Sequence, residues 1–341
     1  MADLEPAAAP WIAGVDLLAW RRARLSEGGR AVDLDWLLDL EGGLRWPDLQ
    51  RLRLDPDRPV RLHTSLGHLE ELWRRHRCHA VPLQYLVGRC PWRDLELQVA
   101  PGVLIPRQET EALVELALAA TSHPGGHRFF ASVAPPRIAA PALWADLGTG
   151  SACLAVALAL AYPEARGFAV DLSADALEQA RRNLAAAQVL DRVSLLCGSW
   201  WEPLQAHWGQ LDLVLANPPY IPSFCLAGLD PVVRDHEPSL ALDGGPDGLT
   251  CLRSVIAGAA EALRPGGLLL LEHHHDQSPA VLALMAEAGL VQPTAHQDLE
   301  GVWRFACARR AGASGPELVP GRRVSPPASA AGHRPDVLHI P

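Results

Sequence analysis

The stretch Asp146-Leu-Gly-Thr-Gly-Ser-Ala152 decides the fold, because it joins an apolar run typical of a buried strand to one typical of a helix. Gly148 and Gly150 permit a tight turn and let a ligand approach the backbone closely. The start of the following helix offers backbone N–H groups. The third glycine of a dinucleotide-binding turn is absent, because Cys153 occupies its place. The stretch alone therefore favours a ligand-binding turn, with a plain strand-to-helix connection as the alternative.

Outward from this turn, strand-like and helix-like segments alternate along the chain. The expected strands are 143–147, 167–171, 193–197, 211–216, 268–272 and 303–307. Helices are expected at 151–161, 248–263 and 279–288, and a further helix is expected to begin after an N-cap at Ser173. The helix at 248–263 is expected to end at Arg264-Pro-Gly-Gly267. This alternation predicts an α/β fold with a doubly wound sheet, which binds ligands beyond the carboxyl ends of its strands.

The regions before and after these alternating segments show other patterns. The length of 341 residues suits about two domains at roughly 150 residues each. Residues 1–85 predict a small helical bundle with helices at 15–24, 33–40, 47–52 and 65–77. Residues 86–310 form the expected second domain, which begins with strand character over 86–104, a helix at 109–120 and a Gly/Pro-rich loop at 122–142. Residues 311–341 are rich in Pro, Gly, Ser and Arg and are expected to form a disordered tail.

Composition excludes several classes of protein. A hydrophobic fraction of 49% with 20% charged residues excludes a wholly disordered chain. The net charge of −9 counts against a nucleic-acid-binding surface, so no direct nucleic-acid binding is expected. The seven cysteines are scattered without a C-x-x-C pair, which indicates free thiols and a reducing cytoplasm. The N-terminus does not resemble a signal peptide, and the longest apolar run, 152–162, is too short to span a bilayer.

Asp171 ends the strand expected after the glycine turn. A carboxylate at this place can accept hydrogen bonds from both hydroxyls of a ribose, as in other doubly wound folds. The alternative is an ordinary solvated aspartate before a helix. The pairing with the glycine turn favours ribose binding.

Asn217-Pro-Pro-Tyr220 follows the strand expected at 211–216 and is the sharpest chemical signal in the chain. Two prolines fix an extended backbone and remove two N–H donors, which leaves carbonyl acceptors beside the side-chain oxygen of Asn217. These oxygens can accept both hydrogens of a planar –NH2 group, and the ring of Tyr220 can cover that group. The alternative interpretation of the motif is a polar turn that ends the strand. The chain contains only one other asparagine, Asn183, which falls within an expected helix where alanine or glutamine would serve.

In this order, the motifs resemble those of the release-factor glutamine N5-methyltransferases, which are class I methyltransferases that use S-adenosylmethionine. The resemblance covers about residues 20–310. The matching segments are Pro82-Leu-Gln-Tyr-Leu-Val-Gly88, Pro101-Gly-Val-Leu-Ile-Pro-Arg-Gln-Glu-Thr-Glu111, 146–152, 217–220, Glu237-Pro238 and 244–249. The resemblance implies a Rossmann-like class I methyltransferase sheet preceded by a helical substrate-recognition domain.

The resemblance also implies a role for each site residue. Gly148, Thr149, Gly150, Ser151 and Ala152 would wrap the methionine part of S-adenosylmethionine, Asp171 its ribose and Trp200 its adenine. Asn217, Pro218, Pro219 and Tyr220 would hold the substrate glutamine, with Asn217 as the catalytic residue, also near the cofactor. Arg107 and Glu109 would line the rim. The chain departs from the family pattern at Gln108, at Ala152 and at His273-His-His275, where proline, glycine and an apolar-Gly segment are usual.

The implied reaction is methylation of the side-chain amide nitrogen of the glutamine in the Gly-Gly-Gln motif of class I peptide chain release factors. The expected enzyme is a cytoplasmic monomer that binds no membrane. The alternatives are an N6-adenine methyltransferase of DNA or RNA, a ribosomal-protein glutamine methyltransferase and a non-enzymatic cofactor-binding scaffold. No metal is expected at 273–275, because adjacent histidines should point in different directions. Capping or solvation is expected for Asp212 and Glu272 in preference to a role as general base.

Overall fold

The computed structural model describes residues 11–121 and 134–312. Within these residues, internal contacts give two units: the described chain up to Arg89 together with Pro231–His236, and the described chain from Cys90 to Asp230 together with that from Glu237 onward. The division lies near the boundary expected at residue 85. The sequence showed no sign that 231–236 packs with the first unit. Residues 122–133 of the loop expected at 122–142 lie outside the described residues, as does nearly all of the expected tail.

The first unit is mainly helical. Its helices are α1 (Gly14–Ser26), α2 (Ala31–Leu40), α3 (Trp46–Leu54), α4 (Leu66–His79), α5 (Leu83–Val87) and α9 (Pro231–Arg234). The side chains of Leu17, Leu34, Leu37, Leu69 and Trp73 are buried between them. The four helices predicted for this region are confirmed. The sequence did not predict α5 or the antiparallel pair β1 (Trp11–Ala13) and β2 (Pro59–Arg61), which are too short to produce a periodic pattern.

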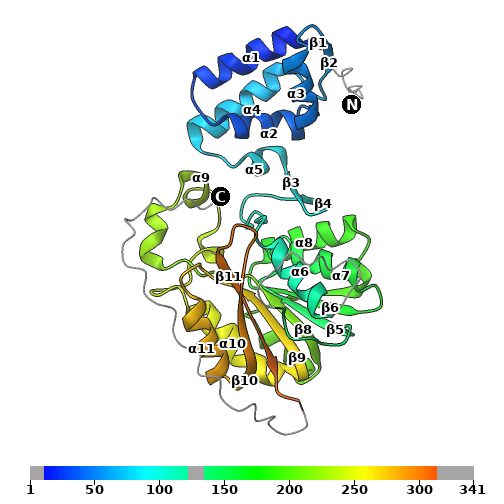
Figure 1. Cartoon of the computed structure of the whole chain (residues 1–341), viewed down its shortest axis with the longest axis vertical. Helices are drawn as coiled ribbons and strands as arrows, with labels where there is room; N and C mark the ends of the chain where they lie inside the picture. The colour runs from blue at the N-terminus through cyan, green and yellow to red at the C-terminus, as the bar shows by residue number, and fades with distance from the viewer. Residues whose placement is uncertain (1–10, 122–133, 313–341) are drawn as a thin grey trace. The chain divides into compact units, whose positions relative to one another are not determined.

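The second unit is built on a seven-stranded sheet with the order β10-β11-β9-β8-β5-β6-β7 (Figure 1). The strands β5 to β9 are parallel, and β10 and β11 join antiparallel at one edge. Their bounds are Leu143–Leu147 (β5), Arg166–Asp171 (β6), Val193–Cys197 (β7), Leu211–Ala216 (β8), Leu263–Glu272 (β9), Leu290–Gln297 (β10) and Trp303–Arg310 (β11). A separate pair, β3 (Arg89–Trp92) and β4 (Leu95–Gln98), precedes the sheet.

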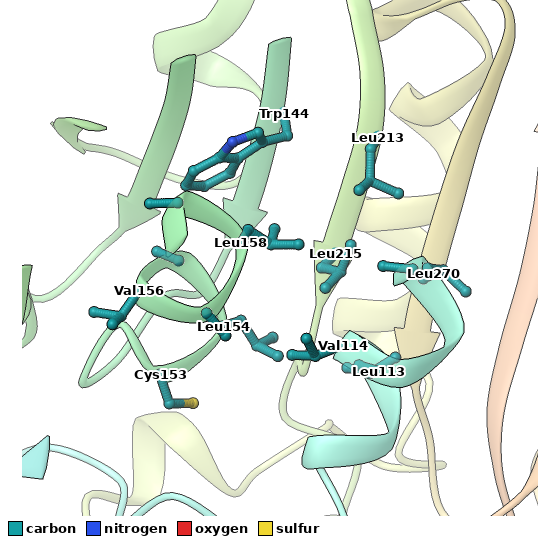
Figure 2. Close-up of a cluster of buried hydrophobic side chains, with 14 of the residues drawn as sticks. Leu113, Val114, Trp144, Cys153, Leu154, Val156, Leu158, Leu213, Leu215 and Leu270 are labelled. Carbon is teal, nitrogen blue, oxygen red and sulfur yellow. The ribbon is translucent and has the colours of Figure 1, made fainter. Parts of the chain in front are cut away.

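Helices cover both faces of the sheet. They are α6 (Glu111–Ala120), α7 (Cys153–Ala161), α8 (Ala174–Ala186), α10 (Thr250–Ala262) and α11 (Ser278–Glu287). Alternate residues of β8 serve opposite faces, so Leu213 and Leu215 pack with α6 and α7 while Val214 packs with α10 and α11. Figure 2 shows the first of these two cores, around Trp144 and Leu158. The α/β class and the doubly wound arrangement are confirmed.

Two strands of this unit differ from the prediction. The predicted helix end before Arg264-Pro-Gly-Gly267 is confirmed, because α10 ends at Ala262. The next strand was expected to begin at 268, but β9 already begins at Leu263, which pairs with Leu211. The segment is a bulge in β9, where Gly266 takes a φ of +81° and a Cβ on Gly267 would lie 2.7 Å from the Leu211 carbonyl oxygen. The strand β10 was not predicted, because this edge strand contains a bulge and Pro293 and so lacks alternation.

Helix termini follow the sequence closely where a side chain caps them. Ser173 accepts a hydrogen bond from the Ala176 N–H at 3.3 Å, as predicted for the start of α8. Within the part of the chain that the structure describes, no helix combines the length and the apolar character needed to cross a membrane.

Candidate active site

The glycine turn lies between β5 and α7 and is tied to the neighbouring strand β6. The backbone N–H groups of Gly148 and Thr149 both donate to the carbonyl oxygen of Val170 at 2.9 Å. Gly148 has a φ of +74°, and a Cβ there would lie 3.3 Å from the ring of Trp200. Glycine is therefore required here both by backbone conformation and by the close approach of an aromatic ring. Two N–H groups of the turn are thus bound to β6 and are not available to a ligand.

Asp171 joins the glycine turn to the start of α8. Its Oδ2 accepts from the Gly150 N–H and its Oδ1 accepts from the Ser173 N–H, both at 2.9 Å. Burial raises the pKa of this carboxyl, while the backbone hydrogen bonds oppose the rise. Each oxygen keeps further lone-pair capacity, so the carboxylate can still accept hydroxyl groups from a ligand.

A cavity of about 250 Å³ opens at the carboxyl ends of β5, β6 and β8. Eight of the predicted site residues line it: Gly148, Thr149, Gly150, Ser151, Asp171, Trp200, Asn217 and Pro219. Arg107 also lines it, as do the unpredicted residues Thr110, Leu172, Leu240 and Cys251. Such an apolar-walled pocket with a few convergent polar groups is typical of a small-molecule site.

Four predicted residues do not line this cavity. Ala152 and Pro218 are buried behind it, and Ala152 has a φ of +65° in the left-handed region that favours glycine. Tyr220 is half-buried and donates its hydroxyl hydrogen to Glu272. Glu109 is also absent from the lining. These four predicted residues therefore form no part of the cavity lining.

A buried hydrogen-bond chain connects the two ends of Asn217-Pro-Pro-Tyr220. The Nδ2 of Asn217 donates to Oγ1 of Thr110 at 3.0 Å, and the Thr110 hydroxyl donates to Oε2 of Glu272 at 2.7 Å. The Tyr220 hydroxyl donates to Oε1 of the same carboxylate at 2.9 Å. Thr110 and Glu272 are 2% and 1% exposed. The expectation that Glu272 is solvated or caps an element was wrong, because the strand order places it beneath the motif.

Burial raises the pKa of Glu272 to about 7, while its hydrogen bonds from Thr110 and Tyr220 and the nearby Arg304 oppose the rise. Asp212 is different, because it accepts the N–H groups of Ala142 and Leu143 at 2.8 Å and so caps the chain that enters β5, as expected. Of the two carboxylates, only Glu272 is thus connected to the candidate site.

The rim segment before α6 is held by a buried ion pair. Arg107 donates to Oε1 of Glu237 at 2.8 Å, and Oε2 of Glu237 accepts from the Ile105 N–H at 3.2 Å. The indole of Trp92 donates to the carbonyl oxygen of Arg107 at 2.8 Å. These contacts fix the segment that also brings Thr110 to the cavity. Thr110 was missed as a site residue, although it belongs to the quoted segment 101–111.

The expectation that alanine would serve at Asn183 was wrong, because its side chain makes buried hydrogen bonds. It is 2% exposed, and its Oδ1 accepts from the Gln98 N–H at 2.8 Å. Its Nδ2 donates to the carbonyl oxygens of Gln98 and Ser151. Asn183 therefore binds the glycine turn to β4, and both asparagines of the chain support the same region.

The His273-His-His275 segment lies next to Tyr220. His273 is buried, and the Nδ1 of His274 pairs with Asp276 at 2.7 Å. The rings of His274 and His275 lie 4.1 Å apart, so the expectation that adjacent histidines diverge was wrong for this pair. Gln277 fastens the segment to the motif, because its Nε2 donates to the Tyr220 carbonyl oxygen at 3.0 Å. The absence of a metal here stays a prediction.

A seven-stranded sheet with an antiparallel edge, a glycine turn after β5 and an acidic residue at the end of β6 defines the class I methyltransferase fold. In agreement, a family model described as a methyltransferase domain matches residues 145–224. The chain is 51% identical over 295 residues to a protein from Prochlorococcus marinus, with 86% of this chain and 96% of that protein covered.

Two further relatives come from Gloeobacter violaceus and Synechocystis. They are 45% and 37% identical, over 78% and 88% of this chain and 87% and 98% of their own lengths. All three relatives are named release factor glutamine methyltransferase. The chain belongs to the release factor glutamine methyltransferase family.

Proposed function

We propose that this enzyme transfers a methyl group from S-adenosylmethionine to N5 of the glutamine in the Gly-Gly-Gln motif of class I peptide chain release factors. Family membership supports the reaction class and the protein substrate. The observation that carries the proposal is Asn217, which lines the cavity and lies directly before two prolines that lack N–H donors. A planar amide –NH2 is the group that such an array of acceptors fits.

The cavity lining fits S-adenosylmethionine. The missing side chain of Gly148 leaves the turn flat against Trp200, which offers a ring for the adenine. Asp171 offers a carboxylate for the ribose hydroxyls, and Thr149, Gly150 and Ser151 would surround the methionine part. Ala152 would support this turn from behind. When bound, the cofactor supplies an activated sulfonium methyl group.

The protein's part in the reaction is to position the glutamine amide. An amide nitrogen is a poor nucleophile, because its lone pair is delocalised into the carbonyl group. The Asn217 side-chain oxygen and the adjacent carbonyls would accept its two hydrogens, which orients the nitrogen and weakens that delocalisation. Pro218 and Pro219 would hold these acceptors in an extended backbone. Tyr220, anchored on Glu272, would fix the end of the motif.

The proposed partner is the release factor itself, with the helical first unit as its recognition domain and with no direct contact to nucleic acid. We place the reaction of a monomeric enzyme in the cytoplasm, where translation termination occurs. The N6-adenine alternative shares the acceptor array but needs a basic face for phosphates, and the chain has a net charge of −9.

A transfer assay tests the proposal. The enzyme is incubated with methyl-labelled S-adenosylmethionine and, separately, with a class I release factor, the same factor with its Gly-Gly-Gln glutamine replaced by asparagine, a ribosomal protein mixture, and DNA or RNA. Label is expected on the intact release factor alone, and mass spectrometry should locate one methyl group on the motif glutamine. Label on nucleic acid or on ribosomal protein, with none on the release factor, would refute it.

A further inference from the structure

We propose that Thr110 and Glu272 are positioning residues that set the orientation of the Asn217 amide, so that its oxygen faces the substrate nitrogen. This inference rests on the proposed function, because it assigns the origin of the acceptor which that function requires. Neither residue belongs to the Asn217-to-Tyr220 motif. They reach it from the segment before α6 and from the end of β9.

The direction of each hydrogen bond follows from counting donors. An ionised carboxylate has no hydrogen to donate, so Glu272 accepts from Thr110 at 2.7 Å and from Tyr220 at 2.9 Å. The single hydrogen of the Thr110 hydroxyl is then used, and its oxygen can only accept from its other neighbour. That neighbour is the Asn217 side chain at 3.0 Å, which must present Nδ2. The amide oxygen of Asn217 is thereby turned to the opposite side.

Burial favours this one set of hydrogen-bond directions between Asn217, Thr110 and Glu272. Thr110 and Glu272 are almost completely removed from solvent, so water cannot readily substitute for a missing partner. A flipped Asn217 amide would place its oxygen against an oxygen of Thr110 and would present –NH2 to the –NH2 of the substrate. Both contacts are unfavourable, because each pairs like with like. The hydrogen bonds from Asn217 through Thr110 to Glu272 therefore keep the side-chain oxygen of Asn217 directed toward the substrate nitrogen.

Protonation of Glu272 reverses the direction of some hydrogen bonds between Glu272, Thr110 and Asn217. A protonated carboxyl donates through one oxygen, so either Thr110 or Tyr220 loses its acceptor. If Thr110 is affected, its hydrogen turns toward Asn217 and favours the flipped amide. The other ionisable groups that act on Glu272 are Tyr220, Arg304 on β11 and Glu109, and Arg304 is itself paired with Asp298 at 2.7 Å. With a pKa of about 7 for Glu272, the reversal falls within the neutral range.

Side-chain amide resonances test the orientation in the free enzyme, without cofactor or substrate. The full chain holds only two asparagines, so labelling with 15N-asparagine gives two side-chain –NH2 signals. Asn183 serves as an internal control, because its amide is bound to backbone groups of Gln98 and Ser151. Asn217→Asp assigns the signals. The Asn217 signal is expected to shift with a midpoint near pH 7, and that shift should vanish in Glu272→Gln and in Thr110→Val while the Asn183 signal stays constant.

Steady-state kinetics give the second readout. Thr110→Val keeps the shape but removes the hydroxyl, and it should lower kcat by roughly tenfold or more. Thr110→Ser should restore most of the loss. Glu272→Gln should lower kcat and remove the acidic limb of the pH profile, because its amide can accept only one of the two hydrogen bonds. S-adenosylmethionine affinity, measured by calorimetry, should change little in Glu272→Gln, because Glu272 does not line the cavity.

The outcomes separate the inference from the proposed function. An inactive native enzyme on release factor would refute the function and leave the resonance test of the orientation intact. An active native enzyme with an unshifted Asn217 signal between pH 6 and pH 8, or an equally active Thr110→Val variant, would overturn the inference alone. A variant that loses both folding and signal dispersion is replaced by Thr110→Ala, for which the same loss and the same serine rescue are expected.

Discussion

Asn217 is the residue whose replacement should affect turnover most directly. Asn217→Ala removes one acceptor aimed at the substrate nitrogen, and loss of a single oriented hydrogen-bond partner at a reacting centre costs roughly 10²–10³ in kcat. The variant should bind S-adenosylmethionine with only modest weakening, because Asp171 and the glycine turn are unchanged. Rate measurements and calorimetry on the same preparation check both statements. Near-normal methylation by this variant would contradict the assigned role.

Glu272 should make stability depend on pH with a definite sign. Burial raises its pKa from 4.5 to about 7, so the folded state binds the proton more tightly than the unfolded state. The stabilisation from that proton is complete below the unfolded pKa and is lost as pH rises through about 7. Glu272→Gln cannot ionise, so its melting temperature relative to the native protein should increase between about pH 5 and about pH 8.

Melting curves of both proteins across this range test the sign. Burial also raises the pKa of Asp146 to about 7, but Asp146 is present in both proteins and cancels from their difference. A difference that is constant with pH, or that decreases, would contradict the prediction. Together with the orientation of Asn217, the expected result means that ionised Glu272 favours catalysis while its protonated form favours stability.

At the scale of elements, Gly148 in the turn between β5 and α7 has a matched control in Gly289, which lies between α11 and β10. Gly148 and Gly289 have φ values of +74° and +79°, but a Cβ would meet Trp200 at 3.3 Å in the first case and nothing within 4 Å in the second. Alanine at either position should cost about 1–2 kcal/mol from backbone strain. Only Gly148→Ala should also displace Trp200 and weaken S-adenosylmethionine binding. Calorimetric affinities and denaturant unfolding distinguish the two effects, and equal affinities in both variants would exclude the contact with Trp200.

Elements also differ in how far the sequence predicts them. The strand β5 and the neighbouring β8 were predicted correctly because both are buried runs bounded by clear turns. The helix end before 264–267 was predicted correctly, but the bulge that this segment forms in β9 was not, since Pro and Gly have the same local signature in both settings. Only pairing with Leu211 distinguishes them, and pairing between distant segments leaves no local pattern. The half-exposed edge strand β10 was missed because a bulge and Pro293 interrupt its alternation.

At the scale of the whole molecule, the two units have separate cores and should respond separately to mutation and ligand. Leu37 and Leu213 are both fully buried, in the first and second unit respectively. Leu37→Ala should destabilise the first unit by about 2–5 kcal/mol, and Leu213→Ala the second by a similar amount. S-adenosylmethionine should raise only the transition of the second unit, because binding stabilises the part that holds the ligand.

Scanning calorimetry with and without S-adenosylmethionine tests this independence. Two transitions are expected in Leu37→Ala, the first one lowered and unaffected by the ligand. A single transition that shifts as a whole in both variants would show that the units unfold together. Glu237 and Arg107, which fix the rim of the cavity, belong to the second unit and should melt with it.

The sequence by itself determined the α/β class, the strand-to-helix turn, the placement of Asp171 and Asn217 after their strands, and the chemistry that their side chains offer. These features are local, since they depend on periodicity, on glycine and proline conformation and on functional groups within a few residues. Only the tertiary structure decided which groups support the motif. Thr110 and Glu272 lie 162 residues apart and meet because β9 lies beside β8 in the sheet, next to α6. Burial there gives Glu272 its raised pKa, and neither strand order nor burial can be read from the neighbouring residues.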